Sequence, residues 1–424
     1  MNDTAPHVTR AWVLHPDIRS DRQRRDPVMA LDEAVALASA LPGLEVVGQE
    51  VVPLPDPHPR ALFGSGKIDE LGERISAEGI ELVLVDGPVT PVQQRNLEKA
   101  WKVKLLDRTG LILEIFSDRA ATREGVLQVE MAHLSYQRTR LVRAWTHLER
   151  QRGGLGFVGG PGETQIEADR RAIDEQLVRL RRQLDKVVKT RSLHRKARAK
   201  VPYPIVALVG YTNAGKSTLF NRLTGAEVMA KDMLFATLDP TMRGVKLEDG
   251  PEVILSDTVG FISDLPTELV AAFRATLEEV LEADLIVHVR DISHPNAQEQ
   301  ADDVHAILAS LGVAETTPQI EVWNKIDQLG PEAREAAMTR AERVPSIFAL
   351  SAWTGEGMAP LLAGIARAIE GEKTREALHL GFEDGRKRAW LFERGLVEDE
   401  AQTEDGYDLH VRWTAKEAAQ FEKV

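Results

Sequence analysis

The chain has 424 residues, of which 43% are hydrophobic and 28% are charged, a composition typical of a soluble globular protein with two or three domains. It contains no cysteine, which excludes disulfides, cysteine-zinc sites and thiol nucleophiles and fits a reducing compartment. The first ten residues lack an apolar signal core, and no run reaches the roughly 18 apolar residues of a membrane span. We therefore expect a cytoplasmic protein without a membrane partner.

The net charge of −13 is unevenly distributed along the chain. Residues 119–200 carry 19 Lys and Arg against 9 Asp and Glu, a local charge of +10, so the remainder carries −23. A concentrated basic segment can bind nucleic-acid phosphates while the acidic remainder keeps the protein in solution. The charge pattern indicates one region for contact with nucleic acid.

Residues 10–117 alternate between strand-like and helix-like patterns. They predict strands at 11–14, 44–47, 80–85 and 103–106, and helices near 28–40, 67–78 and 91–100. This alternation is typical of a small parallel α/β layer. Asp107 and Arg108 follow the last of these strands, and we interpret them as part of a structural ion pair rather than as a binding site.

A long helical section follows. Its apolar residues recur at spacings of three and four, first at Leu127, Met131, Leu134, Leu141, Trp145 and Leu148, and then at Ile173, Leu177, Leu180, Leu184 and Val187. Two such stripes predict an antiparallel helical hairpin that packs along them. The basic residues 191–200 are interpreted as a linker, which ends where two prolines, Pro202 and Pro204, stop the helix.

The predicted hairpin tip, residues 153–162, contains six glycines. Thr164 and Glu167 then form a T-x-x-E capping box that predicts the start of the second helix. A flexible turn is one interpretation, but two antiparallel helices need only two to five linking residues. The other interpretation is close approach to RNA. The candidate RNA contacts are Arg150, Arg152, Phe157, Arg170 and Arg171.

The clearest motif runs from Gly210 to Ser217 and fits G-x-x-x-x-G-K-[ST] between a predicted strand and a predicted helix. Backbone N–H groups of this loop would converge on the β-phosphate of a nucleotide. Lys216 would neutralise the β and γ oxygens, and the Ser217 hydroxyl would hold Mg²⁺. A similar stretch, residues 64–67, lacks the first glycine and the hydroxyl, so we interpret it as a helix start.

Two later motifs identify the base and the switches. Asp257-Thr-Val-Gly260 ends an apolar run, which places Asp257 near the metal and lets Gly260 donate its N–H to the γ-phosphate. A second short strand ends in Asn324-Lys-Ile-Asp327, where Asp327 would accept two hydrogen bonds from guanine. Adenine lacks that pair of donors, so the carboxylate discriminates against it. The sequence therefore predicts GTP as the nucleotide.

The first switch is predicted at residues 231–241, where Thr237 is favoured over Thr241 as the threonine that completes the Mg²⁺ shell. In the second switch, Phe261 occupies the position where many GTPases have the glutamine that orients the attacking water. A phenyl ring cannot hydrogen-bond water, so intrinsic hydrolysis should be slow. Alternatively, Phe261 simply packs against the nucleotide-free site, and both interpretations can hold together.

We predict a catalytic role for Lys216, Thr237 and Gly260, and Mg²⁺ contacts from Ser217, Thr237 and Asp257. The full set of predicted nucleotide contacts is Gly210, Tyr211, Thr212, Asn213, Ala214, Gly215, Lys216, Ser217, Phe235, Ala236, Thr237, Leu238, Asp239, Asp257, Thr258, Val259, Gly260, Asn324, Lys325, Ile326, Asp327, Ser351, Ala352 and Trp353.

These motifs resemble the translation-factor class of P-loop GTPases and, within it, the HflX family. The resemblance rests on residues 235–241, 257–261, 107–116 and 160–171, and covers about residues 10 to 370. It implies that the GTP form binds the large ribosomal subunit, with the helical hairpin near the peptidyl transferase centre. It also implies that the protein helps to separate or rescue ribosomes and leaves after hydrolysis.

We expect an α/β protein with four parts: an N-terminal α/β domain (1–118), the basic hairpin (119–200), a P-loop GTPase domain (201–372) and a small C-terminal α+β domain (373–424). Its predicted partners are GTP or GDP, Mg²⁺ and the large (50S) ribosomal subunit with its rRNA, and we expect a monomer. Two other functions remain open. One is a ribosome-assembly or RNA-modification GTPase that acts on free RNA, and the other is a nucleotide-gated protein scaffold.

Overall fold

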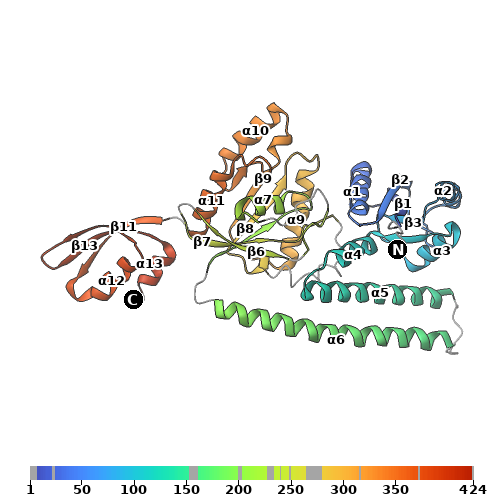
Figure 1. Ribbon diagram of the computed structural model, residues 1–424, viewed down its shortest axis with the longest axis horizontal. Coiled ribbons are helices and arrows are strands. Elements are labelled where there is room, and N and C mark those ends of the chain that lie inside the picture. The colour runs from blue at the N-terminus through green and yellow to red at the C-terminus, as the bar shows by residue number, and fades with distance from the viewer. Residues whose placement is uncertain are drawn as a thin grey trace, which may run out of the picture.

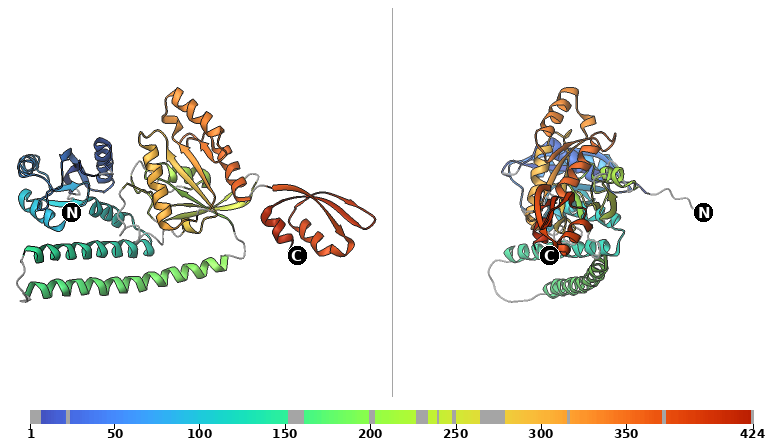
Figure 2. Two further views of the ribbon diagram at one scale, coloured as in Figure 1. Left: turned by 180° about the vertical axis from the view of Figure 1, so that it is seen from behind. Right: turned by 90° about the vertical axis from the view of Figure 1, so that its left-hand side faces the viewer.

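The computed structural model describes residues 7–21, 24–151, 161–198, 203–226, 234–238, 240–247, 250–263, 279–314, 317–370 and 373–422. These residues form three separate β-sheets and a pair of long helices (Figure 1). The N-terminal and C-terminal sheets lie on opposite sides of the central one, and the two long helices run side by side along one edge of the molecule (Figures 1 and 2).

The N-terminal sheet is parallel throughout, with the order β2-β1-β3-β4, as the sequence predicts. Its strands are β1 (Thr9–Ile18), β2 (Leu44–Leu54), β3 (Leu82–Val85) and β4 (Lys104–Asp107). Its helices are α1 (Pro27–Ser39), α2 (Ser65–Ala77), α3 (Pro91–Trp101) and α4 (Arg108–Arg119). Gly64 is the N-cap of α2, which confirms that residues 64–67 start a helix.

Helices α5 (Arg123–Gln151) and α6 (Pro161–Arg198) form the hairpin. Leu127, Leu177 and Leu180 of the predicted stripes are buried. Helix α6 begins at Pro161, so the expected start at the Thr164 capping box is wrong; proline is preorganised for the first helical position. The helix also continues to Arg198, so most of the expected linker at 191–200 is helical. Residues 152–160 of the tip lie outside the described residues.

The central sheet has the order β10-β9-β8-β5-β7-β6 and is parallel except for β6. Its strands are β5 (Ile205–Val209), β6 (Thr241–Lys246), β7 (Glu252–Asp257), β8 (Leu285–Asp291), β9 (Gln319–Asn324) and β10 (Ile347–Ala349). The helical elements around it are α7 (Lys216–Thr224), α9 (Ala297–Leu311), η1 (Ile326–Gln328), α10 (Pro331–Glu342) and α11 (Met358–Glu370). Parallel strands place the ends of β5, β7 and β9 at one edge of the sheet, where ligands bind in such folds.

One hydrophobic core is shared between the N-terminal and central domains. It joins Leu111 and Ile115 of α4 and Val129 of α5 to Val209 and Phe261 near the end of β5. The opposite faces of the two sheets have separate cores. The N-terminal domain is therefore packed against the central sheet edge rather than tethered to it.

The C-terminal domain is a three-stranded antiparallel sheet with the order β11-β13-β12. Its elements are β11 (Lys373–Gly381), η2 (Phe382–Asp384), α12 (Gly385–Glu393), β12 (Val397–Gln402), β13 (Gly406–Thr414) and α13 (Ala415–Phe421). Leu391, Val411 and Trp413 are buried in its own core. Among the described residues, none of the helices combines the length and the apolar character needed to cross a bilayer.

Candidate nucleotide site

The loop from Gly210 to Ser217 joins β5 to α7, and its conformation requires both of its glycines. Gly210 has φ 151° and Gly215 has φ 94°. A Cβ atom at Gly210 would lie 2.2 Å from the carbonyl oxygen of Val289, and one at Gly215 would lie 2.2 Å from Nδ2 of Asn324. Any side chain would displace β8 or the N-K-x-D motif. The loop is therefore packed closely against the end of β8 at Gly210 and against the end of β9 at Gly215.

Lys216, the first residue of α7, is buried within this loop. Its ammonium group donates hydrogen bonds to the carbonyl oxygens of Gly210 at 3.1 Å and Tyr211 at 2.8 Å. Burial lowers the pKa of Lys216 to about 8, although the nearby Asp257 carboxylate acts against this shift. A buried cation whose hydrogen bonds within the described residues go to neutral carbonyl groups is well placed to attract phosphate oxygens.

Three oxygen-bearing side chains converge beside Lys216. The Ser217 hydroxyl lies 2.7 Å from Oδ2 of Asp257 and 2.8 Å from the Thr237 hydroxyl, and the Thr237 hydroxyl lies 3.0 Å from the same Oδ2. The other carboxylate oxygen of Asp257 is buried and has no hydrogen-bond partner in the part of the chain that the structure describes, and burial raises the pKa of Asp257. Hard oxygen donors of this kind suit Mg²⁺.

The second switch lies directly against the loop. The Phe261 N–H donates to the Gly210 carbonyl at 3.1 Å, and the Thr212 N–H donates to the Phe261 carbonyl at 2.7 Å. A Cβ atom at Gly260 would lie 2.8 Å from Cγ2 of Thr212 and 3.0 Å from Nζ of Lys216. The cavity between the loop and the switches measures about 40 Å³. Gly260 and the backbone of Phe261 are therefore packed closely against the phosphate loop.

Asn324, at the end of β9, connects the phosphate loop to the base-binding loop. Its amide nitrogen donates to the Ala214 carbonyl at 2.8 Å, and its amide oxygen accepts from the Ala352 N–H at 2.9 Å. Next to it, Lys325 has φ 64° and forms an ion pair with Asp291 at 2.7 Å. The first residues of the N-K-x-D motif thus act as structural connectors, and Asp327 lies exposed on the turn that follows.

Arg222 on α7 was not predicted from the sequence. It donates to the carbonyl oxygens of Ala352, at 3.1 Å, and Trp353. The side chain of Trp353 is 79% exposed, whereas Ser351 and Ala352 are buried. Arg222 therefore holds the backbone of the base-binding loop, and Trp353 contributes its main chain to this arrangement.

Several predicted contacts have structural roles for their side chains. Phe235, Leu238 and Val259 point into the shared core, and the Thr258 hydroxyl donates to the Leu208 carbonyl at 2.6 Å. These residues can contact a nucleotide only through their backbones. Asp239 lies outside the described residues. Thr241 starts β6 and is paired with Asp257 across the strands.

The predicted RNA contacts fall partly outside the described residues. Arg170 and Arg171 are exposed on α6. Arg150 lies in helix α5, and Arg152 and Phe157 lie outside the described residues. The structure thus leaves this set as a prediction.

Comparisons with known proteins place the whole chain in one family. Models described as GTP-binding GTPase N-terminal, GTP-binding GTPase Middle Region, 50S ribosome-binding GTPase and HflX C-terminal domain match residues 29–117, 119–198, 205–325 and 336–424. The last of these extends the resemblance beyond residue 370, where the motifs alone end.

Two curated relatives match over nearly the full length. GTPase HflX of Magnetococcus marinus is 50% identical over 392 residues, covering 92% of this chain and 89% of the relative. GTPase HflX of Escherichia coli is 44% identical over 405 residues, covering 95% of this chain and 93% of the relative.

A solved structure of a GTP-binding protein from Sulfolobus solfataricus in complex with GDP is 21% identical and has a TM-score of 0.45. It covers 85% of this chain and 99% of that one. The phosphate loop, the D-x-x-G and N-K-x-D motifs and the full-length identity to curated relatives lead to one conclusion: the chain belongs to the HflX family of GTPases.

Proposed function

We propose that this GTPase binds the large ribosomal subunit in its GTP form, promotes the separation or rescue of ribosomes, and is released when GTP is hydrolysed. The basic hairpin is the proposed contact with rRNA, because residues 119–200 carry a local charge of +10. The description of the family model that matches residues 205–325 names 50S ribosome-binding GTPases, which supports the same partner.

The position of Phe261 is the observation that carries this proposal. Phe261 takes the place of the water-orienting glutamine, is 1% exposed, and is bonded through its backbone to the phosphate loop. Its ring can neither hydrogen-bond a water molecule nor reach solvent from this position. Turnover therefore depends on a partner that moves the second switch and completes the site, and GTP hydrolysis becomes a timer for that partner.

Within the site, we assign roles by position. The N–H groups of the loop and the ammonium of Lys216 hold the β- and γ-phosphates, and the Gly260 N–H binds the γ-phosphate once the switch has moved. Asp327 recognises guanine. Ser217, Thr237 and Asp257 would hold Mg²⁺, which the unpartnered Asp257 oxygen supports. When bound there, Mg²⁺ would neutralise charge on the β- and γ-phosphates.

The test measures GTP turnover by the full chain with large subunits, small subunits, whole ribosomes and naked rRNA added in turn. We expect strong stimulation by large subunits or whole ribosomes. Stimulation by naked RNA alone would favour the assembly or RNA-modification function. Absence of stimulation, together with partner binding that is insensitive to salt, would favour the scaffold.

A hairpin variant sharpens this test. Replacing the glycines at 153–162 by alanine should weaken large-subunit binding about tenfold, or 1.4 kcal/mol, because each added Cβ keeps the backbone away from RNA. Intrinsic GTP turnover should not change, because the tip is remote in sequence from the nucleotide site. An equal loss of both would mean that the glycines serve the fold of the hairpin.

A further inference from the structure

Helix α4 of the N-terminal domain touches both switches of the nucleotide site. At its start, Nη2 of Arg108 donates to the carbonyl oxygen of Ser263 at 2.8 Å, two residues beyond Phe261. Toward its end, the ring of Phe116 meets the ring of Phe235 edge-on, with centroids 4.7 Å apart. One helix outside the GTPase domain is therefore in contact with the segments that must move during the GTP cycle.

Arg108 is fixed by two carboxylates. It is 5% exposed and bonds to Asp86 at 2.6 Å and to Glu33 at 2.5 Å. Burial opposes its charge, but Asp86 and Glu33 raise the pKa of Arg108 above its usual value. This confirms the interpretation of Arg108 as part of a structural ion pair. Its bond to Ser263 adds a function that an isolated ion pair does not have.

Glu33 provides a second connection to the same switch. Its other carboxylate oxygen accepts a hydrogen bond from the Tyr211 hydroxyl in the phosphate loop. The same hydroxyl oxygen accepts the Ser263 N–H at 2.7 Å. Burial and the charge of Glu33 raise the pKa of Tyr211, so the phenol keeps its proton. The N-terminal domain thus holds the Ser263 carbonyl directly through Arg108. The Ser263 N–H, in contrast, is held by Tyr211 of the GTPase domain, whose hydroxyl is in turn bonded to Glu33.

The residue before Arg108 is bonded to the hairpin. Asp107 accepts hydrogen bonds from the Tyr136 hydroxyl at 2.6 Å and from Arg140 at 3.0 Å, both on α5. It also caps α4 by accepting the Gly110 N–H at 2.9 Å. Burial and the charge of Asp107 raise the pKa of Tyr136, so its hydroxyl stays a donor.

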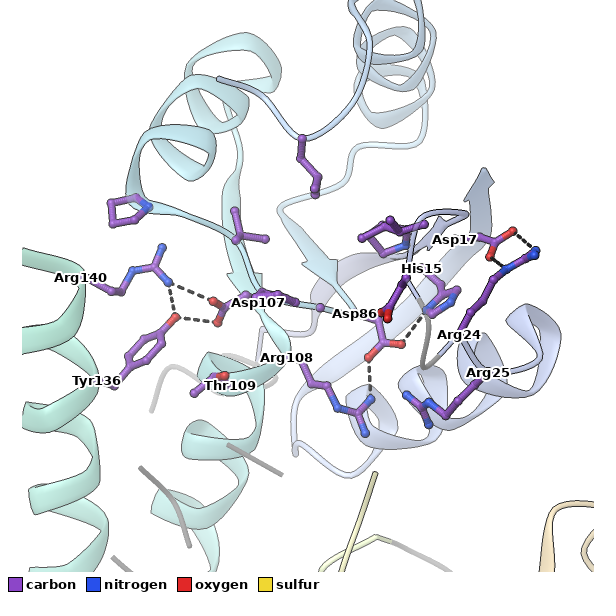
Figure 3. A pocket seen from close by; sticks show the side chains of 18 of the residues that line it. His15, Asp17, Arg24, Arg25, Asp86, Asp107, Arg108, Thr109, Tyr136 and Arg140 are labelled. Atoms are coloured by element: carbon purple, nitrogen blue, oxygen red, sulfur yellow. Dashed lines mark hydrogen bonds and ion pairs between the residues drawn. The ribbon is translucent and has the colours of Figure 1, made fainter. Parts of the chain in front are cut away.

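Figure 3 shows the two neighbours pointing in opposite directions, Asp107 toward Tyr136 and Arg140, and Arg108 toward Asp86. They stand at the edge of a cavity of about 530 Å³, beyond the ends of β1, β3 and β4. The dipeptide at the end of β4 is thus bonded to α5 on one side and to the second switch on the other.

We propose that Asp107 and Arg108 couple the helical hairpin to the second switch. A displacement of α5 moves Asp107 and the start of α4, Arg108 shifts with it, and Ser263 is released together with Gly260 and Phe261 from the phosphate loop. Arg108 and Glu33 are positioning residues, since neither touches the reacting atoms. The coupling rests on the proposed function, because contact of the hairpin with the large subunit supplies the displacement.

The hydrogen-bond pattern favours two discrete arrangements. Arg108 is buried, and its charge is satisfied only when its carboxylate partners are in place. A partial shift would leave a buried cation without full compensation, so the group moves as a unit or not at all. A purely structural ion pair, in contrast, predicts that breaking the α5 bonds to Asp107 leaves the stimulation of turnover by bound large subunits unchanged.

The first test removes both bonds from α5 to Asp107 with the double variant Tyr136→Phe/Arg140→Gln in the full chain. The control is Arg138→Gln, which removes an ion pair to Asp174 between the two hairpin helices without reaching Asp107. We expect large-subunit affinity and intrinsic turnover to stay within about twofold for both variants. The stimulation of turnover by large subunits should fall about tenfold only in the double variant Tyr136→Phe/Arg140→Gln. Equal stimulation of the two variants would overturn the coupling.

The second test needs no ribosome and uses Glu33→Gln, which weakens both connections to Ser263. Asp32→Asn is the control, since it makes the same charge change on an exposed neighbour in α1. We expect a fluorescent GTP analogue to associate about tenfold faster with Glu33→Gln, and hydrogen exchange over 258–263 to accelerate. Thermal melting checks that both variants are folded. Identical behaviour of the two would show that Glu33 does not hold the switch.

The two proposals can fail separately. If large subunits do not stimulate the unmodified chain, the proposed function is wrong, and the nucleotide-association test still decides whether the N-terminal domain holds the switch. If the unmodified chain is stimulated but the double variant Tyr136→Phe/Arg140→Gln behaves like its control, the ribosomal function stands and the coupling is wrong.

Discussion

Lys67 and Lys216 follow similar glycine-containing stretches, one in the N-terminal domain and one in the GTPase domain. Lys67 forms ion pairs with Glu50 at 2.5 Å and Glu70 at 2.7 Å; partial burial opposes its charge, but these carboxylates raise its pKa. Burial among neutral carbonyl groups lowers the pKa of Lys216 to about 8. The same residue type becomes a surface ion-pair partner or a phosphate-binding group according to its surroundings.

The preceding backbone accounts for this difference. Before Lys216, a buried strand ends in a glycine that fits tightly against Val289, so the loop folds back over the lysine. Before Lys67, the chain enters α2 at Gly64, where an added Cβ would meet nothing within 4 Å. A glycine that is needed for close packing thus distinguishes a phosphate loop from a helix start.

The largest expected effect tests this comparison directly. Lys216→Ala should lower kcat/KM for GTP by about 10²–10³-fold, the usual loss when one preorganised electrostatic donor is removed. Lys67→Ala should leave it unchanged, because its ion pairs are remote from the nucleotide. Steady-state GTP turnover, measured for both variants, tests this difference in kcat/KM. A comparable loss in Lys67→Ala would mean that the N-terminal domain takes part in nucleotide chemistry.

The next effect concerns the base. Asp327→Asn should shift the preference from GTP toward XTP by about a hundredfold, because the amide donates where the carboxylate accepted. Turnover with each nucleotide at equal concentration measures this ratio. Asp302→Asn, on α9, is the charge-matched control. An Asp327→Asn variant that hydrolyses GTP at the normal rate would contradict base recognition by this residue.

The smallest effect separates a backbone contact from a side-chain contact. Arg222→Ala should weaken GDP binding several-fold, or roughly 1 kcal/mol, because the carbonyl groups of Ala352 and Trp353 lose the donor that holds them. Trp353→Ala should change GDP affinity less than about twofold, since the ring is 79% exposed. Calorimetric titration with GDP compares the two. A larger effect at Trp353 would show that its ring covers the base.

The phosphate loop could be predicted because its chemistry depends on residues close together in the chain, and Asp257 because it begins a D-x-x-G motif at the end of an apolar run. Gly210, Lys216 and Ser217 lie within eight positions, and each requirement of the loop appears as a residue type. The strands on either side of these motifs could also be predicted, because a short apolar run between two helical patterns usually forms a buried strand. The hairpin tip and Asp239 remain predictions.

The contacts between the N-terminal domain and the switches could not be predicted, because no local sequence motif marks them. Arg108 and Ser263 are 155 positions apart, and Glu33 and Tyr211 are 178 apart, so only the docking of two domains brings them together. Arg222 acts through backbone carbonyls, which any residue could provide. The capping box at Thr164 was misleading because Pro161, three positions earlier, already satisfies the geometry of a helix start.

The length of α5 has a mechanical consequence. From Tyr136 to its end at Gln151 the helix extends about 22 Å, at 1.5 Å per residue. In the proposed coupling, α5 acts as a lever that turns about its buried residues Val129 and Ala132, and the Tyr136–Asp107 bond lies on its short arm. A tilt of about 5° moves that end by about 2 Å. In the proposed coupling, a displacement of this size at the far end of α5 therefore corresponds to a small rotation where α4 begins.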